Sequence, residues 1–423
     1  MRVPAAPLVF AFVFLVGMTL GLIALASNPG IAYTPDSAEY LAGAEDIVKH
    51  GFSVLFNPPT HPEFAMSVLW FSRPPAYPAL LALLARLPLV STEAWNFIVL
   101  WSLTMLTVIS LYLFLKRKIG GGWVPAVVLP AISLPWATSI MADNAFFLAI
   151  GLFLIAFLCF LEEPVWARAL LVILMGALSG FTKPVGAFAC IIVVFAGLLD
   201  RRARPLSAMI ASVLVAIVVL WSYRNQTLYG RFLFSQVTDL NMAFFNYPAL
   251  LAQETGVREW KLRDSLMRDF GREVSERGIS SDDRAKTLLL AEKAGSATRY
   301  IMAKPFDYAI CHMRYLPRAL GSPVISLGGK PGPGGFSPFG LINVFARAAS
   351  FLLAILGIPF WWKKDRVQFA ALVAGALWLV LSMGPAGDDR TSLPGLLFVS
   401  VLAQGGWLVI KTKLIASGHG NVR

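Results

Sequence analysis

The sequence predicts an all-α polytopic membrane protein, a bundle of about ten helices that span the bilayer, with further helices in its external loops. Three observations support this fold class. Of the 423 residues, 57% are hydrophobic and only 14% are charged, whereas a soluble domain carries about 25% charged residues. Several apolar runs approach or exceed the roughly 18 residues that a spanning helix needs. Lysine and arginine gather in short loops between these runs, as the positive-inside rule expects of cytoplasmic loops.

The expected spanning segments are apolar runs that end at polar residues: 7–27, 92–115, 123–140, 145–161, 168–181, 185–199, 206–222, 341–362, 367–383 and 392–410. The first follows Met1-Arg2 and has no convincing cleavage site after it, so we expect a retained anchor rather than a removed signal peptide. The fifth and sixth are short, and about 14 residues cover roughly 21 Å of a core about 30 Å thick. Lys183, which lies between them, is therefore expected below the membrane surface.

The chain divides into three modules by its polar stretches. They are an N-terminal transmembrane module (1–222) with a catalytic first external loop (28–91), a large external region (223–340) and a C-terminal set of spans (341–423). Within the large region we expect an amphipathic helix over 258–276 and a second helix over 282–303. The second would begin at a capping box formed by Ser280 and Asp283. Cys159 and Cys190 fall in apolar segments and Cys311 in a loop, so no disulfide framework is expected.

The basic clusters and the candidate site residues fall on opposite faces of this topology. With ten spans, the clusters at 116–118, 201–204, 363–366 and 411–413 all become cytoplasmic. The net charge of +12 is therefore explained by membrane topology, and no nucleic-acid partner is expected. The other face carries the residues that could take part in catalysis or substrate binding: Asp36, Arg73, Asp143, Lys183, Arg224, Asp389 and Arg390.

Carboxylates beside arginine and lysine at a membrane edge suit one kind of chemistry. The cations can bind a phosphate carried on a lipid, and a carboxylate can remove a proton from an attacking hydroxyl. Sugar transfer from a polyprenyl-phosphate donor needs both, because the phosphate leaves without a general acid and only its developing charge must be stabilised. His50, His61 and Glu63 could bind a metal, although their spacing matches no strong motif, and a divalent cation is left open.

Two stretches carry a resemblance to a known family. Thr34-Pro-Asp-Ser-Ala-Glu-Tyr40, followed by Arg73-Pro-Pro-Ala-Tyr-Pro78, resembles the first external loop of GT-C fold glycosyltransferases of the protein mannosyltransferase superfamily. That superfamily includes the bacterial lipid A aminoarabinose transferases and the rhizobial lipid galacturonosyltransferases. Further similar features follow in the same order: Asp143-Asn144, Lys183-Pro184, Trp221-Ser-Tyr-Arg-Asn225 and Asp389-Arg390.

The resemblance implies an activity and a set of site residues. Asp36 would be the base that activates the acceptor, in an inverting transfer on the outer face of the membrane, and Asp143 would be the second acidic site. Ser37 follows Asp36 where the family commonly has an acidic residue. The expected substrate-binding residues are Glu39, Tyr40, Arg73, Lys183, Arg224, Asp389 and Arg390. The expected partners are a polyprenyl-phosphate-sugar donor, a lipid, glycan or protein acceptor, and the bilayer of a bacterial inner membrane, with the site on its periplasmic side.

Simpler interpretations of the same residues remain open at this stage. Asp36 could be only a helix-start carboxylate, and Asp143 only a cap on the following span. Lys183 could extend toward the interface, and Arg347, inside the eighth span, is expected to extend outward to it. Arg390 could pair with Asp388 or Asp389, and Arg73 and Arg224 with loop carboxylates. The whole chain could also be a transporter or flippase of a lipid-linked sugar, or an inactive family member that binds a partner. We find no internal repeat of the kind that transporters show.

Overall fold

The computed structural model describes residues 5–34, 36–64, 66–87, 90–317, 321, 337–382, 384–385 and 393–418, which form helices and turns and contain no β-strand. The long apolar helices are α1 (Ala5–Ser27), α5 (Thr92–Ile119), α6 (Trp123–Ala137), α7 (Ala142–Glu162), α8 (Trp166–Thr182), α9 (Pro184–Ala196), α10 (Arg204–Tyr229), α16 (Pro338–Lys364), α17 (Arg366–Leu381) and α18 (Leu393–Gly418). The first external loop forms η1 (Pro29–Ala32), α2 (Ser37–His50), η2 (Gly51–Leu55), α3 (Leu69–Ser72) and α4 (Ala76–Leu84). The remaining elements are η3 (Gly197–Leu199), α11 (Val237–Asn241), the π-helical turn η4 (Met242–Asn246), α12 (Tyr247–Thr255), α13 (Glu259–Glu276), α14 (Asp283–Met302) and α15 (Pro305–Tyr315).

The all-α membrane fold class is confirmed. Among the described residues, six helices are long and apolar enough to cross a membrane, namely α1, α5, α7, α10, α16 and α18. Four further apolar helices, α6, α8, α9 and α17, have 10–17 residues. The predicted number of ten spans requires that these four also cross the bilayer, and it stays a prediction, as do the three module boundaries.

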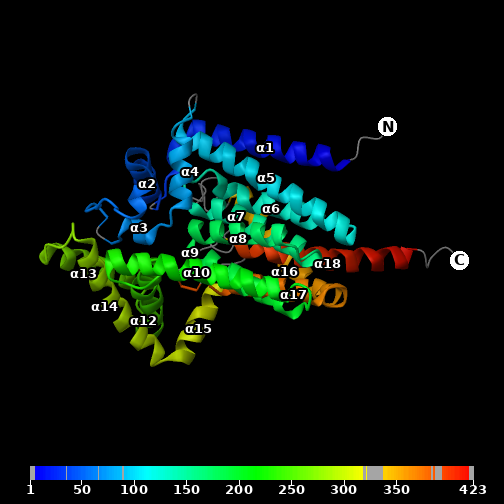
Figure 1. Ribbon diagram of the computed structural model, residues 1–423. Coiled ribbons are helices and arrows are strands. Elements are labelled where there is room, and N and C mark those ends of the chain that lie inside the picture. Colours follow the sequence, from blue (N-terminus) through cyan, green and yellow to red (C-terminus); the bar gives the residue numbers. More distant parts are fainter. Residues whose placement is uncertain are drawn as a thin grey trace.

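The long helices run side by side, and the external helices gather at one end of the bundle (Figure 1). The α1 helix begins, and α18 finishes, at the opposite end (Figure 1). The basic residues Lys116–Lys118 lie in the last turn of α5, and Lys363 and Lys364 in the last turn of α16. Cations are favoured at these helix C-termini by the helix dipole. The arrangement therefore separates a basic end from an end that carries α2 and α12–α14.

Close backbone packing holds the centre of the bundle together. The α16 and α18 helices cross at Gly357 and Gly406, where a Cβ on Gly406 would lie 1.9 Å from the Leu353 carbonyl oxygen. Only glycine permits this approach, and small residues at helix contacts are typical of membrane proteins. The middle of the bundle is therefore a fixed frame on which the external end is built.

Two expectations about the large external region need correction. The α14 helix is capped by Asp282, whose side chain accepts a hydrogen bond from the Ala285 amide, rather than by Ser280. The Asp282 side chain reaches the N3 amide, the usual geometry for a cap. Cys311 lies in α15 and is buried rather than lying in a loop, and all three cysteines are free. The predicted amphipathic helix is present as α13.

Candidate active site at the external end of the bundle

The first external loop is fixed to the turn between α6 and α7 before it reaches Asp36. The Ile140 amide donates to the Ala32 carbonyl at 2.8 Å, and the Ser37 hydroxyl donates to the Ile140 carbonyl at 2.8 Å. The Ser37 hydroxyl also accepts from the Thr34 amide at 2.8 Å. Because Ser37 is the first residue of α2, these bonds set where that helix begins. They therefore place Asp36 next to the residues that lead into α7.

Asp36 does not serve as a side-chain cap for α2. Its Oδ1 instead accepts from Arg73 Nη2 at 2.9 Å, and the Arg73 Nε donates to Glu39 Oε2 at 2.5 Å. A second oxygen of Glu39 accepts from the Ser67 hydroxyl at 2.7 Å. The i, i+3 spacing of Asp36 and Glu39 puts both carboxylates on one side of the helix start. One guanidinium therefore holds both, as the planar fork of arginine allows.

Tyr40 lies beneath this fork. The Arg73 guanidinium is 5.0 Å from the centre of the Tyr40 ring. Burial raises the pKa of Tyr40 well above its usual value. The Arg73 charge lowers that pKa, but it is outweighed, and the charges of Asp36, Asp143 and Glu39 raise it further. Tyr40 therefore remains a neutral phenol at physiological pH, and among the described residues the nearby carboxylates are the candidate bases.

Asp143 and Lys183 form a second ion pair at the same end of the bundle. Asp143 lies inside the first turn of α7, whose cap position is Met141, so the interpretation of Asp143 as the cap itself is wrong. Its carboxylate gains from the positive end of the α7 dipole. Lys183 adopts an extended backbone between α8 and α9, as expected for a residue that precedes a proline. The Lys183 side chain is 26% exposed, whereas that of Asp143 is 7% exposed, so the lysine covers its partner.

We call the five residues Asp36, Glu39, Arg73, Asp143 and Lys183 the ion-pair cluster. The anchoring bonds at Ile140, three residues before Asp143, connect its two halves. The Tyr40 hydroxyl experiences the charge of both halves. Of the two catalytic candidates, Asp36 is the more accessible, because its side chain is 32% exposed. The cluster thus contains an accessible carboxylate and an accessible lysine, each held by an oppositely charged neighbour.

Arg224 lies outside the cluster, although it holds the same loop. Its Nε donates to the Leu55 carbonyl at 2.6 Å and its Nη1 to the Trp70 carbonyl at 3.2 Å. Its guanidinium is 4.7 Å from the centre of the Trp221 ring. The alternative role, pairing with a loop carboxylate, is not found among the described hydrogen bonds of Arg224, which go to carbonyl and amide oxygens. Arg224 therefore fastens the backbone of the first loop to α10, and direct contact with a substrate stays a prediction.

The Arg347 prediction was wrong. Rather than extending outward, Arg347 is fully buried, and its Nε donates to the Asn343 side chain. Asn343, Arg347 and Ser350 recur at i, i+4 and i+7 and are all buried on one face of α16. This spacing was the signal that the sequence offered, because polar residues at helical period inside an apolar span face protein rather than lipid.

Two further groups of predicted residues have different outcomes. Asp388, Asp389 and Arg390 lie outside the described residues.

Both ring nitrogens of His61 are hydrogen-bonded, one to Asp46 Oδ2 and the other to Glu63 Oε1, each at 2.9 Å. His50 takes no part in that arrangement, and in the described residues no three His, Cys, Asp or Glu side chains are placed so that they could hold a metal ion together. The trio of His50, His61 and Glu63 is therefore not a metal site in the described part of the chain.

Comparisons with known proteins place the fold. No protein-family model matches the chain, and no curated protein matches it. Two solved structures of the oligosaccharyltransferase AglB from Archaeoglobus fulgidus match almost all of it. The complex with an inhibitory peptide and a dolichol-phosphate is 15% identical, with a TM-score of 0.50, over 98% of this chain and 52% of that chain. The apo form is 16% identical, with a TM-score of 0.51, over 97% of this chain and 52% of that chain.

The chain has the GT-C fold. It is a multi-pass, all-α membrane protein that spans about half the length of the solved structures it matches. The predicted GT-C resemblance is thus confirmed at the level of the fold. The ion-pair cluster occupies the first external loop and the starts of α7 and α9, which are the regions from which the resemblance was drawn. The narrower superfamily within the GT-C fold stays a prediction.

Proposed function

We propose that this protein is an integral membrane glycosyltransferase of the GT-C type. It transfers a sugar from a polyprenyl-phosphate donor to a lipid, glycan or protein acceptor on the extracytoplasmic face, the periplasmic side of a bacterial inner membrane. The observation that carries the proposal is the ion-pair cluster, in which an accessible carboxylate and an accessible lysine are held at one end of a GT-C bundle.

Asp36 is the base of the proposed reaction. The acceptor hydroxyl oxygen attacks the anomeric carbon of the donor sugar, and its proton passes to the Asp36 carboxylate. The bond from that carbon to the phosphate oxygen breaks on the opposite side, so the configuration inverts. Arg73 holds one oxygen of Asp36 at 2.9 Å and thereby orients the carboxylate toward the acceptor. A positioned base of this kind contributes about 10²–10⁴-fold to the rate.

Lys183 is the principal phosphate ligand in this proposal, and Arg390 is the second. Negative charge develops on the phosphate oxygen as the lipid phosphate leaves, and cations at that position stabilise the transition state more than the ground state. Asp143 keeps the Lys183 ammonium at the external end of the bundle. AglB has been solved with a dolichol-phosphate, a lipid that carries a phosphate. That complex supports a lipid-linked donor for the fold.

The remaining candidates take supporting roles. Glu39 and Tyr40 hold the Arg73 guanidinium from two sides, which fixes Asp36 in turn. Arg224 fastens the first loop to α10. Asp389 is proposed to orient Arg390. Asp143, which is nearly covered, acts on Lys183 rather than on the acceptor.

Donor consumption tests the proposal directly. The purified chain is placed in vesicles with a radiolabelled polyprenyl-phosphate hexose in the outer leaflet, together with extracted envelope lipids and glycans as acceptors. The expected result is labelled acceptor and released polyprenyl phosphate, and neither in protein-free vesicles. If the label crosses to the inner leaflet with its phosphate linkage intact, the transporter interpretation replaces ours. If the donor is neither consumed nor moved, the chain is not a transferase for this donor class.

A further inference from the structure

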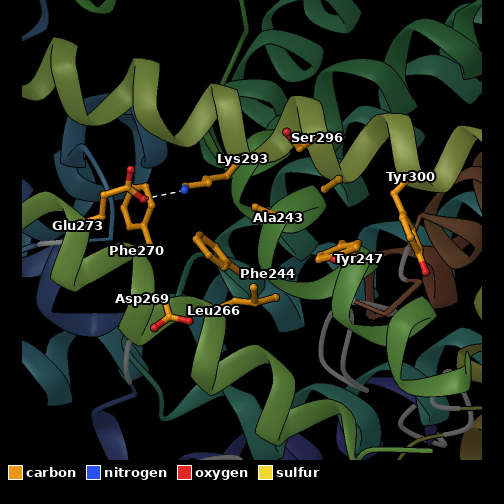
Figure 2. Close-up of a pocket in the computed structure, with 11 residues that line it drawn as sticks. Ala243, Phe244, Tyr247, Leu266, Asp269, Phe270, Glu273, Lys293, Ser296 and Tyr300 are labelled. Atoms are coloured by element: carbon orange, nitrogen blue, oxygen red, sulfur yellow. Dashed lines mark ion pairs between the residues drawn. The ribbon is translucent and has the colours of Figure 1, made fainter. Parts of the chain in front are cut away.

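A second site lies in the external helices, at a distance along the chain from the ion-pair cluster. A cavity of about 370 Å³ opens between α13 and α14 and is closed on its inner side by η4 and α12. Its volume falls at the small end of the range of about 300–1,000 Å³ that small-molecule sites occupy. Figure 2 shows the side chains from these elements facing one another across the space. None of them belongs to the ion-pair cluster.

Aromatic rings form the walls of this cavity. Phe244 and Phe270 are buried and meet edge to face, with ring centres 5.6 Å apart. Tyr247 and Tyr300 meet in the same way at 5.2 Å and are only partly buried. The Tyr300 hydroxyl donates to Glu254, which fixes the orientation of its ring. Two buried rings thus make the floor. The Lys304 ammonium lies 4.4 Å from the centre of the Tyr300 ring, so Tyr247 is the ring on which a ligand would stack.

An ion pair stands at one side of these rings. Lys293 of α14 contacts Glu273 Oε2 of α13 at 2.6 Å, as the dashed line in Figure 2 shows. Carboxylate oxygens and an ammonium group beside aromatic rings offer acceptors and donors next to flat apolar faces. A sugar ring has the matching chemistry, since its C–H face is apolar and its rim carries hydroxyl groups. A lipid chain would leave the charged groups unmatched, and the helices around the cavity include no candidate membrane span.

The cavity is linked to the ion-pair cluster through the first external loop. Met66 packs against the apolar cluster that contains Phe244 and Phe270. The next residue, Ser67, donates its hydroxyl to Glu39, which in turn binds Arg73. Phe244 itself lies in the π-helical turn η4, and such turns are rare and frequently occur at functional sites. The apolar cluster at the floor of the cavity therefore packs against the same short segment that supports the ion-pair cluster.

We propose that this cavity binds a sugar ring of the acceptor glycan, one that is already present before transfer, by stacking it on Tyr247 beside the Lys293–Glu273 ion pair. The proposal rests on the proposed function, because it assigns the acceptor to the carbohydrate class. It makes the external helices the element that selects the acceptor, while the ion-pair cluster carries out the transfer.

Saturation-transfer NMR on the whole chain in nanodiscs tests the proposal. The probes are the methyl glycosides of glucose, galactose, mannose and N-acetylglucosamine, with cyclohexanol as an apolar control. We expect at least one glycoside to receive saturation at its ring C–H protons. Tyr247→Ala should weaken its binding by about five- to tenfold, as expected for the loss of one ring contact. Tyr247→Phe, which keeps the ring, should bind normally.

Trp260→Ala is the matched control. Trp260 is an aromatic residue of α13 that is 48% exposed and lies outside the cavity, so its removal should leave binding unchanged. The inference is overturned if no glycoside receives saturation. It is also overturned if Tyr247→Ala binds as the wild type does, or if cyclohexanol binds where the glycosides do not.

The two proposals fail separately. Glycoside binding should persist in Asp36→Asn, which the proposed function expects to be inactive. If the chain consumes the donor but does not bind glycosides through Tyr247, the proposed acceptor site is wrong and the transferase assignment stands. If the chain binds glycosides through Tyr247 but never consumes the donor, the transferase assignment is wrong, and so is the acceptor role of the cavity.

Discussion

Removal of the Arg73 guanidinium is the most informative perturbation of the first loop. Arg73→Met keeps the length of the side chain but deletes both of its hydrogen bonds, to Asp36 at 2.9 Å and to Glu39 at 2.5 Å. It also leaves two carboxylates facing each other without a cation. A hydrogen bond to a charged group contributes about 1.5–3 kcal/mol. Because Asp36 is 32% exposed, solvent screens part of that value, and we expect a net loss of about 3 kcal/mol.

The assay is thermal unfolding of the purified protein in detergent. A loss of about 3 kcal/mol should lower the apparent Tm by roughly 3–4 °C in a chain of 423 residues. Arg73→Lys should show an intermediate loss, because lysine keeps the charge but not the fork. The matched control is Arg272→Met, which breaks an exposed Arg272–Asp269 pair of the same 2.9 Å length. That change should cost no more than about 1 kcal/mol. Equal shifts in Arg73→Met and Arg272→Met would refute the reasoning.

Three further predictions concern separate parts of the molecule. Lys183→Met should weaken donor binding by at least about tenfold, as expected for the loss of one hydrogen bond between charged groups, and should leave acceptor binding unchanged. The measurement is titration with a polyprenyl-phosphate sugar, and Lys183→Arg should restore most of the affinity. Unchanged donor affinity would return Lys183 to a purely structural role. Burial lowers the pKa of His61, but the hydrogen bonds that its ring donates to two carboxylates outweigh burial, and the pKa is raised. The stabilising contribution of His61 is therefore full below about pH 6.5 and is lost as the pH rises through the raised pKa. The wild-type Tm should therefore fall over that window while that of His61→Gln does not, and parallel curves would contradict this. Gly406→Ala should prevent stable insertion, because a Cβ there would lie 1.9 Å from a backbone oxygen of α16. Gly271→Ala adds a Cβ that meets nothing within 4 Å, so this control should leave the stability of the protein unchanged or slightly higher. Equal yields of folded protein from the two variants would contradict the packing.

The sequence predicted the bundle and the composition of the ion-pair cluster for physical reasons that are local. The lengths of the apolar runs, the basic clusters in the loops and the turn residues between runs indicate directly which segments span the membrane and which face each loop occupies. They placed Asp36, Arg73, Asp143 and Lys183 on one face of the membrane, and the structure joins them in two ion pairs. The sequence could not predict which cation pairs with which carboxylate, because that pairing depends on where separate helices begin in space.

The misassigned residues share a different reason. Arg347 was expected to reach the interface because a charge in an apolar span usually does. Its burial depends on the neighbours of α16, which one-dimensional patterns do not contain. Asp282 replaced Ser280 as the cap of α14 because helix starts are uncertain by one or two residues when several capping residues adjoin. The cavity at Tyr247 had no signal in the sequence, since its walls come from four separate elements.

The central claim is that Asp36 is the base, and the turnover of Asp36→Asn tests it most directly. Asparagine keeps the size and the hydrogen-bonding oxygen that Arg73 contacts but cannot accept the acceptor proton. Initial rates of transfer from a polyprenyl-phosphate sugar are compared between the wild type and Asp36→Asn, with Tm and donor affinity measured on the same preparations. We predict a loss of at least about 10²-fold in turnover, with donor affinity retained. Turnover within about twofold of the wild type, in a folded protein that binds the donor, would contradict the assignment.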